Sequence, residues 1–193
     1  MHEIIIATSN KGKLKEFNEI LNKYNIKCIG LEELCYADEI VEDGLTFKEN
    51  AFIKGKTIFE LFNKPVLSDD SGLCVKALNN APGIHSARYM NLDSFDEKMD
   101  YILEQLHEQR DAFFNCTLCL YTSENVYYFE GILNGIISKE KNGTNGFGYD
   151  PIFIPNGYEK TLAQLDSNEK NNISHRSEAT KLLLNFLNEN NIF

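Results

Sequence analysis

The sequence has no tryptophan, only four prolines and only three arginines among its 193 residues. It also lacks an uninterrupted apolar run of the roughly 18 residues that a membrane-spanning helix requires, so we expect no membrane partner. Its first residues do not form the basic region and long apolar core of a secretory signal, which favours a cytoplasmic protein. The hydrophobic fraction of 42% is that of a globular chain and argues against collagen-like or disordered structure.

Positive charge is also scarce, because 19 basic residues face 29 acidic ones and the formal net charge is -10. Nonspecific binding to a nucleic-acid backbone requires a cationic face, so we expect no nucleic-acid partner. A nucleotide ligand stays compatible with this charge, since a few well-placed cations are enough to bind it.

The five cysteines are an odd number and cannot all pair within the chain. Cys116 and Cys119 form a CxxC motif, which could be half of a zinc site or a redox pair. No second CxxC or histidine pair accompanies it, and the apolar run 113–121 around it is typical of a buried strand. We therefore expect these cysteines to act as small hydrophobic residues.

Strand-like and helix-like segments alternate along the chain, which predicts an α/β fold with a mixed sheet. The length favours a single domain over residues 1–193, or two tightly packed lobes around one core. Expected strands cover residues 3–8, 27–30, 65–68, 112–122, 126–133 and 135–139. Expected helices begin near residues 11, 46, 94 and 175, two of them at the capping boxes Thr46/Glu49 and Ser94/Glu97.

The segment Thr8-Ser9-Asn10-Lys11-Gly12-Lys13 lies where the first strand gives way to the first helix. Backbone N–H groups at a helix N-terminus favour anions, and lysine adds a positive charge. The alternative is an ordinary turn in which Ser9 or Asn10 caps the helix. We favour phosphate binding, because ligands of open α/β sheets bind at the carboxyl ends of strands.

Acidic residues follow the strand at 65–68, in the segment Ser68-Asp69-Asp70-Ser71-Gly72. Adjacent carboxylates suit a hard cation such as Mg²⁺, and one of them could take a proton from an attacking water. Consecutive strand residues point to opposite faces, so we expect one aspartate to be catalytic and the other supportive. The alternative is an acidic turn with Gly72 at positive φ. Glu42 precedes the second helix and could join the metal site.

Two further segments carry groups suited to a nucleotide base. In the glycine-rich segment 143–151, Phe147 and Tyr149 could stack on a base and Asp150 could accept a ring N–H; a hairpin loop with buried aromatics is the alternative. In the segment 170–176, His175 and Arg176 precede the last helix, where cations are unfavourable unless an anion offsets them.

Taken in order, the motifs TSNKGK, SDDSGL, APGIHSARY, GFGYDPIF and EKNNISHR closely resemble the Ham1-like family, the inosine triphosphate pyrophosphatases. The resemblance spans nearly the whole chain. It implies an elongated two-lobed α/β fold, with a central twisted mixed sheet flanked by helices and the active site in the cleft between the lobes. It also implies a Mg²⁺-dependent homodimer that hydrolyses noncanonical purine nucleoside triphosphates (ITP, dITP, XTP) to the monophosphate and pyrophosphate.

The resemblance also implies roles for particular residues. Asp70 matches the proton acceptor, and Glu42 with Asp70 matches the metal carboxylates. The matching substrate-binding residues are Thr8, Ser9, Asn10, Lys11, Gly12, Lys13, Ser71, Phe147, Gly148, Tyr149, Asp150, Lys170, His175 and Arg176. The chain departs from the usual family pattern at Ser9, where relatives often have glycine, and at Gln164, where they usually have glutamate.

Two alternatives stay open at this point. An enzyme of the similar Maf-like fold would also release pyrophosphate, but from modified pyrimidine nucleotides. A regulator would bind a nucleotide without turnover, although Asp70 and Glu42 argue against it, because binding alone needs no carboxylate that activates water.

Overall fold

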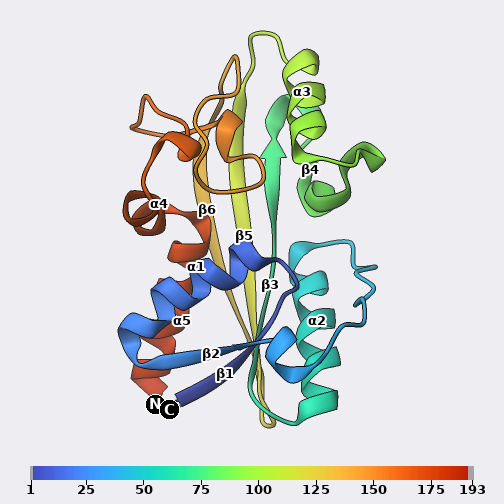
Figure 1. The fold of residues 1–193 in the computed structure, drawn as a ribbon, viewed down its shortest axis with the longest axis vertical. Coiled ribbons are helices and arrows are strands. Elements are labelled where there is room, and N and C mark those ends of the chain that lie inside the picture. The colour runs from blue at the N-terminus through green and yellow to red at the C-terminus, as the bar shows by residue number, and fades with distance from the viewer. Residues whose placement is uncertain (1, 191–193) are drawn as a thin grey trace. The chain divides into compact units, whose positions relative to one another are not determined.

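The computed structural model describes residues 2–190, and five α-helices and seven strands are found within them. The strands are β1 (His2–Ala7), β2 (Ile26–Gly30), β3 (Val66–Val75), β4 (Ala81–Pro82), β5 (Asp111–Tyr121), β6 (Val126–Ile137) and β7 (Phe153–Pro155). The helices are α1 (Lys11–Leu21), α2 (Phe47–Phe62), α3 (Phe95–Gln105), α4 (Ser167–Ile173) and α5 (His175–Asn190). Figure 1 shows their order along the chain.

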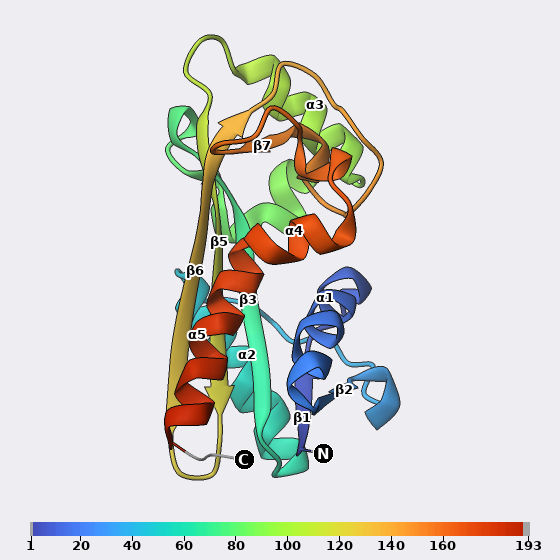
Figure 2. The same ribbon diagram turned by 90° about the vertical axis from the view of Figure 1, so that its left-hand side faces the viewer.

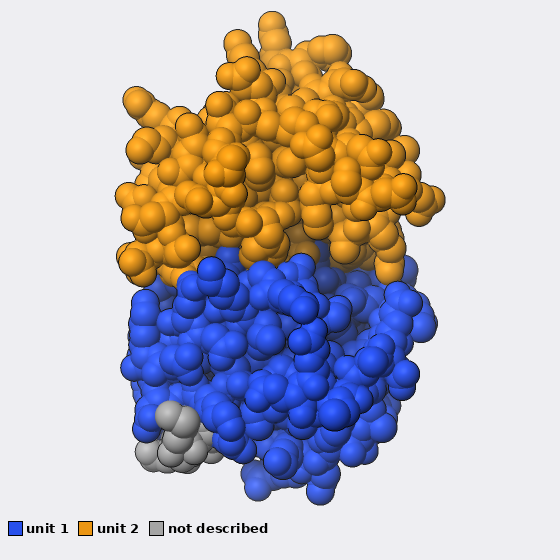
Figure 3. All heavy atoms as spheres, in the orientation of Figure 1, with its two compact units in different colours: residues 1–70, 116–131, 177–193 blue, residues 71–115, 132–176 orange. Residues whose placement is uncertain are grey.

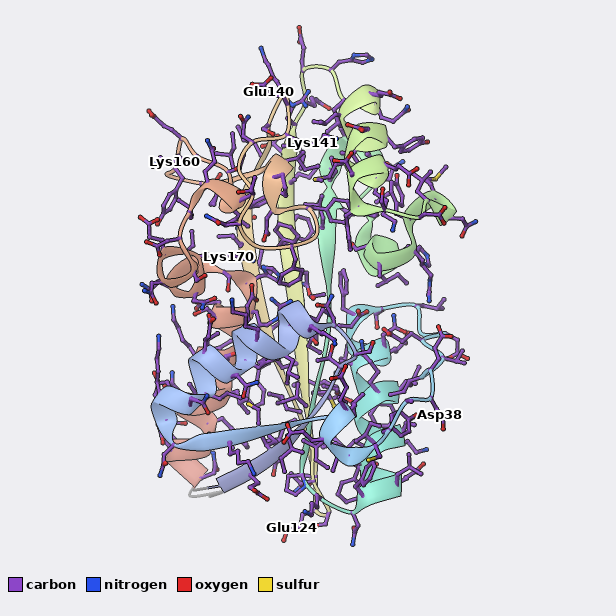
Figure 4. The ribbon with its side chains drawn as sticks, in the orientation of Figure 1. Asp38, Glu124, Glu140, Lys141, Lys160 and Lys170 are labelled. Atoms are coloured by element: carbon purple, nitrogen blue, oxygen red, sulfur yellow. The ribbon has the colours of Figure 1, made fainter. Side chains whose placement is uncertain are left out.

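The strands form one mixed sheet in the order β2-β1-β3-β5-β6-β7, with β4 paired to β3. β1 pairs in parallel with both β2 and β3, whereas β3–β4 and β6–β7 are antiparallel. β5 and β6 are joined by a short turn that contains Glu124 (Figure 4), and such a connection makes neighbouring strands antiparallel. The predicted α/β class with a mixed sheet is confirmed.

The chain divides into two compact units, coloured separately in Figure 3. Unit 1 comprises residues 1–70, 116–131 and 177–193, and unit 2 comprises residues 71–115 and 132–176. The strands β3, β5 and β6 and the helix α5 each contribute residues to both units. The boundary between the units separates two consecutive residues of the SDDSG motif, Asp70 and Ser71.

Unit 1 has helices on both faces of its part of the sheet. On one face, Phe17 and Leu21 of α1 and Leu183 of α5 pack with buried strand residues such as Ile4 and Leu118. On the other face, Ile58 of α2 packs in a second cluster. Figures 1 and 2 show α1 and α5 on the side of the sheet opposite to α2. The amphipathic patterns of these helices therefore mark the faces that they bury.

Unit 2 has a core of its own, in which Met99 and Ile102 of α3 pack with Leu73, Phe114 and Phe153. α3 begins at the predicted capping box, in which the Ser94 hydroxyl accepts from the N–H of Glu97 and the Glu97 carboxylate accepts from the N–H of Ser94. Lys141, labelled in Figure 4, pairs with Asp96 and Asp100 of the same helix at 2.7 and 2.8 Å.

Two expected strand ends were wrong, and glycines explain one of them. β6 runs without a break from Val126 to Ile137, although two separate strands over 126–133 and 135–139 were expected. A Cβ at Gly135 would lie 2.2 Å from the carbonyl oxygen of Ile154 in the neighbouring strand, so this glycine permits close strand packing. β3 continues through the acidic motif to Val75 instead of ending at Ser68.

The cysteines confirm the structural interpretation of the CxxC motif. The thiols of Cys116 and Cys119 are both buried in β5, and Cys28 and Cys74 are buried as well. Burial raises the pKa of Cys28 and Cys119 to about 12 and that of Cys74 to about 11. Cys35 is exposed.

Among residues 2–190, no helix combines the length and the apolar character needed to cross a bilayer.

Candidate active site

In unit 1 the loop between β1 and α1 is shaped by its own polar side chains. The Asn10 side chain caps α1, because its Oδ1 accepts from the N–H groups of Gly12 at 2.9 Å and Lys13 at 3.1 Å. The N–H of Asn10 in turn donates to the hydroxyl of Thr8. The capping role considered for Asn10 is confirmed, and it fixes the direction in which α1 and Lys13 leave the loop.

Asp69 and Asp70 lie inside β3 and pair with lysines on different helices. Lys13 Nζ of α1 lies 2.8 Å from Asp69 Oδ2, whereas Lys54 Nζ of α2 lies 3.8 Å from Asp70 Oδ1. α1 and α2 cover opposite faces of the sheet, so the two carboxylates point apart as strand alternation requires. The two aspartates therefore pair with lysines of different helices, although the charges of Asp69 and Lys13 also act on Lys54 and Asp70. That one aspartate is catalytic and the other supportive stays a prediction.

Two side chains of α2 lie beside Asp70. Asn50 Nδ2 donates to Asp70 Oδ2 at 3.0 Å, and Lys54 Nζ donates to Glu42 Oε2 at 2.9 Å. Asn50 and Lys54 are four residues apart, which places them on one face of the helix. Lys54 therefore links the carboxylates of Glu42 and Asp70 into one cluster.

Charge and burial act in opposite directions on this cluster. Burial raises the pKa of Asp70, while the cations of Lys54 and Lys13 and the Asn50 hydrogen bond counteract the rise. Burial alone would lower the pKa of Lys54, but the carboxylates of Asp69, Asp70 and Glu42 outweigh it and raise that pKa. Lys54 is therefore a firmly charged ammonium group, and Asp70 is a carboxylate whose proton affinity exceeds that of an exposed aspartate.

In unit 2 the glycine-rich loop is organised by Asp150, which is buried. Its Oδ2 accepts from the N–H of Phe147 at 2.9 Å and from Lys170 Nζ at 2.6 Å. Lys170 lies on α4, as Figure 4 shows. Gly146 has φ +76°, and a Cβ there would lie 2.0 Å from Asp150 Oδ2, so a side chain at this position would displace the carboxylate.

Two cations approach the ring of Phe147. Lys170 Nζ lies 4.6 Å and the Arg176 guanidinium carbon 5.7 Å from its centroid. Arg176 Nη2 also donates to the hydroxyl of Ser71 at 3.2 Å. Arg176 is only 1% exposed, which is rare for arginine unless it is paired. Ser71 of the SDDSG motif therefore meets the motifs GFGYDP and NNISHR within unit 2.

The segment 81–89, which carries the motif APGIHSARY, supports this cluster. A Cβ at Gly72 would lie 2.2 Å from the carbonyl oxygen of Gly83 and 2.4 Å from Ser86 Oγ. The Ser86 hydroxyl accepts from the N–H of Leu73, and the Ser86 carbonyl accepts from the Tyr149 hydroxyl at 2.9 Å. Gly72 is thus required for close packing, and the alternative of a turn with positive φ is wrong.

The sequence-predicted residues accordingly fall into two groups. Unit 1 holds Glu42, Asp70 and the loop from Thr8 to Lys13, and unit 2 holds Ser71, Phe147, Gly148, Tyr149, Asp150, Lys170, His175 and Arg176. Within unit 1 the structure brings Glu42 and Asp70 to one lysine, as described. Within unit 2 it brings the loop 147–150 to Lys170, Arg176 and Ser71.

Sequence analysis missed Asn50 and Lys54. The available signal was their spacing of four residues on a helix that follows Glu42, but polar residues at that spacing are common on exposed helix faces.

The structure shows what Gln164 does. Its Oε1 accepts from the N–H of Thr161 at 2.9 Å and completes a capping box. Glutamine and glutamate can both supply this acceptor.

Comparisons with known proteins show what this chain is similar to. The sequence pattern of the Ham1 family matches residues 4–186. The chain is 44% identical over 189 residues to the dITP/XTP pyrophosphatase of Listeria monocytogenes, covering 95% of this chain and 93% of the relative. It is also 44% identical over 193 residues to the dITP/XTP pyrophosphatase of Bacillus subtilis, covering 97% and 98% of the two chains.

Solved structures show the same likeness. The Ham1 protein of Staphylococcus aureus superposes with a TM-score of 0.86 at 40% identity, covering 97% of this chain and 98% of that one. A HAM1 protein from Coxiella burnetii gives a TM-score of 0.88 at 39% identity, covering 98% and 100%.

Proposed function

The chain belongs to the Ham1 family, and from this premise we propose that it hydrolyses dITP, XTP and ITP to the nucleoside monophosphate and pyrophosphate. Relatives that are 44% identical over nearly the whole chain bear the name dITP/XTP pyrophosphatase. The observation that carries the proposal is the cluster of unit 1, in which the buried carboxylate of Asp70 lies beside Lys54 and accepts from Asn50.

Asp70 is the proposed general base. It takes a proton from a water molecule whose oxygen attacks the α-phosphorus, and the bond between that phosphorus and the oxygen bridging to the β-phosphorus breaks. Pyrophosphate leaves with the electron pair of that bond. A carboxylate with a raised pKa suits this role, because the efficiency of a base increases as its pKa approaches the working pH. Asn50 orients the carboxylate, and Lys54 keeps it ionised between turnovers.

Mg²⁺ is the proposed cofactor, and Glu42 and Asp70 are its proposed ligands. The donor chemistry fits, because carboxylate oxygens are the hard ligands that Mg²⁺ prefers and both side chains reach Lys54 Nζ. Within residues 2–190, no group of three or more His, Cys, Asp or Glu side chains forms a metal site. Mg²⁺ commonly keeps several waters and binds substrate phosphates beside one or two carboxylates, so the pair Glu42 and Asp70 is compatible with it. When bound, Mg²⁺ would neutralise negative charge on the phosphate oxygens.

The triphosphate is assigned to the segment Thr8, Ser9, Asn10, Lys11, Gly12 and Lys13. Hydroxyl, amide and ammonium groups gather there at the N-terminus of α1, where the helix dipole favours an anion. Lys13 is held by Asp69 at 2.8 Å, so its ammonium group is already oriented before a phosphate arrives. Preorganised charge of this kind stabilises a transition state without reorganisation of the site.

Recognition of the base is assigned to unit 2. Phe147, with Gly148 beside it, offers a partly exposed aromatic ring, whereas Tyr149 is buried in the core of unit 2 and supports the loop through its hydrogen bond to Ser86. Asp150, Lys170 and Arg176 lie next to Phe147, Arg176 donates to Ser71, and His175 precedes Arg176 in the same motif. Hypoxanthine and xanthine carry a 6-oxo acceptor where adenine has an amino donor. Side chains that donate hydrogen bonds pair with the 6-oxo group but find no acceptor in the amino group of adenine. A site of this kind can discriminate between the two bases by several orders of magnitude.

Three further properties are part of the proposal. Both units belong to a single Ham1-like domain over residues 1–193, which the family match from 4 to 186 supports. The enzyme acts in the cytoplasm, because its substrates belong to the nucleotide pool. It works as a homodimer, as the family resemblance implies, and sedimentation analysis at several protein concentrations tests this state.

The central experiment measures pyrophosphate release from dITP, XTP, ITP, ATP, GTP, UTP and CTP, with and without Mg²⁺. We expect Mg²⁺-dependent release from the first three nucleotides and far slower release from the others. Preferred turnover of pyrimidine nucleotides would instead support a Maf-like activity. Tight binding of dITP without any product would support a regulator, and either result would reject the proposed function.

A further inference from the structure

His175, the first residue of α5, lies in a more specific environment than its neighbours in the motif suggest. Its side chain is buried, and the residue before it, Ser174, ends α4. Its imidazole stacks on the ring of Phe114, with the centroids 4.7 Å apart and the planes inclined by only 10°. Offset stacking of this kind is a preferred geometry for aromatic pairs.

Phe114 is itself held firmly. It lies in the part of β5 that belongs to unit 2, it is 6% exposed, and its ring packs against Phe153 with the centroids 4.7 Å apart and the planes at 58°. Burial in the core of unit 2 leaves this ring little freedom to turn. Phe114 therefore provides a fixed surface against which the imidazole of His175 lies flat.

The plane of an imidazole decides what it can bind. Both ring nitrogens direct their N–H or lone pair within that plane. A ring that is kept parallel to Phe114 can therefore reach a partner only at its edge and only in one plane. Arg176, the next residue, is instead directed toward Phe147 and Ser71. The two neighbouring side chains are thus oriented by different parts of unit 2.

We propose that Phe114 is a positioning residue for base selection, because it fixes the imidazole plane of His175 and thereby the direction of its hydrogen bond to the 6-oxo group of the purine. This inference rests on the proposed function, since it assigns to His175 a contact with the base. It adds Phe114, which lies outside the five sequence motifs, to the residues proposed to control base selection. Small displacements of a hydrogen-bonding group are enough to weaken strongly the discrimination between 6-oxo purines and adenine.

The test compares Phe114→Leu with the matched control Phe153→Leu. Both substitutions remove one buried ring from the same cluster, but only the first removes the ring that stacks on His175. We expect Phe114→Leu to lower the ratio of kcat/KM for ITP to that for ATP by about tenfold, mainly through a higher KM for ITP. Phe153→Leu should change this ratio by less than about twofold at a comparable loss of stability in urea.

A double-mutant cycle with His175→Gln separates positioning from packing. If Phe114 acts through the imidazole, Phe114→Leu changes the ITP/ATP ratio in the parent enzyme but not in the His175→Gln background. An equal change in both backgrounds, or equal effects of the two leucine variants, would overturn the inference.

A measurement without turnover keeps this inference distinct from the proposed function. In the NMR spectrum, the ring protons of His175 should show upfield shifts from the Phe114 ring current, which Phe114→Leu removes and Phe153→Leu retains. If the parent protein fails to release pyrophosphate from ITP while these shifts are present, the proposed function fails and the stacked geometry stands. If the shifts are absent from the parent protein, the inference itself is wrong.

Discussion

The two units carry clusters of opposite character. In unit 1, Asp69, Asp70 and Glu42 are each matched with an ammonium group, Lys13 or Lys54, at 2.8 to 3.8 Å. In unit 2, a single carboxylate, that of Asp150, supports an aromatic ring approached by two cations. The first cluster can hold phosphates and a divalent ion and transfer a proton. The second offers planar and directional groups that suit a purine base.

This difference suggests that turnover and selectivity can be altered separately. Residues of the unit 1 cluster should govern kcat, since their charges act on the reacting phosphorus. Residues of the unit 2 cluster should govern KM and the preference among bases, since they are assigned contacts that exist before the reaction. A variant in one cluster that changes kcat and KM by the same factor would contradict this separation.

The largest effect is expected from Asp70→Asn. The amide keeps the size of the side chain but cannot take a proton, so kcat for dITP should fall by at least about a thousandfold. The folded state should persist, which circular dichroism and urea unfolding can check. Asp69→Asn is the matched control, because it alters the neighbouring carboxylate, which pairs with Lys13, and its kcat should fall less. Retention of more than a tenth of the parent kcat in Asp70→Asn would contradict the assignment.

A smaller effect, in the other cluster, is expected from Arg176→Lys. Lysine keeps the charge but loses the planar guanidinium that reaches Ser71 and Phe147. The KM for XTP should rise by about tenfold or more, whereas kcat should change by less than about threefold. Steady-state kinetics with XTP and ATP would measure both values. A loss confined to kcat would contradict the assignment of base recognition to unit 2.

Packing beneath the unit 2 cluster is tested by Gly72→Ala. The added Cβ meets the backbone carbonyl of Gly83 at 2.2 Å, so the free energy of unfolding should fall by about 2 kcal/mol or more. In Gly30→Ala of unit 1 the nearest atom is the end of the flexible Leu14 side chain, at 2.8 Å, and the loss should be smaller. Urea unfolding compares the two, and equal losses would contradict this explanation of Gly72.

The smallest effect is expected from Gln164→Glu. The new carboxylate can accept from the N–H of Thr161 as the amide does, so stability and kinetics should stay close to those of the parent protein. Gln164→Ala removes the cap and should lower the free energy of unfolding by about 1 kcal/mol. A marked gain of activity in Gln164→Glu would show that this position acts on the substrate.

Much of the fold could be predicted from local patterns. Apolar periodicity and capping residues located every helix except α4, and the buried run around Cys116 marked β5. Strand ends were harder, because glycine also occurs in turns, and Gly135 and Gly72 lie inside continuous strands. Their neighbours in space, Ile154 and Gly83, are what require a glycine at each position. Such contacts depend on the tertiary structure and have no local signature.

The candidate site was predictable where its residues lie within motifs. Asp70, Glu42 and the loop from Thr8 to Lys13 were found because their residue types suggest metal and phosphate chemistry. Lys54 was missed, since one lysine on a helix is normally a surface residue and its burial beside Glu42 follows only from the packing of α2. Phe114 was missed for a similar reason, because a phenylalanine in an apolar strand indicates a core position and not a partner for His175.

The distribution of thiols offers a practical opportunity. Cys35 is exposed at the end of a short turn in unit 1, while Cys28, Cys74, Cys116 and Cys119 are buried. Because burial raises the pKa of Cys28, Cys74 and Cys119, these groups stay protonated near neutral pH and react slowly with maleimides. A fluorophore could therefore be attached at Cys35 of the natural chain, giving an optical reporter without prior removal of other cysteines.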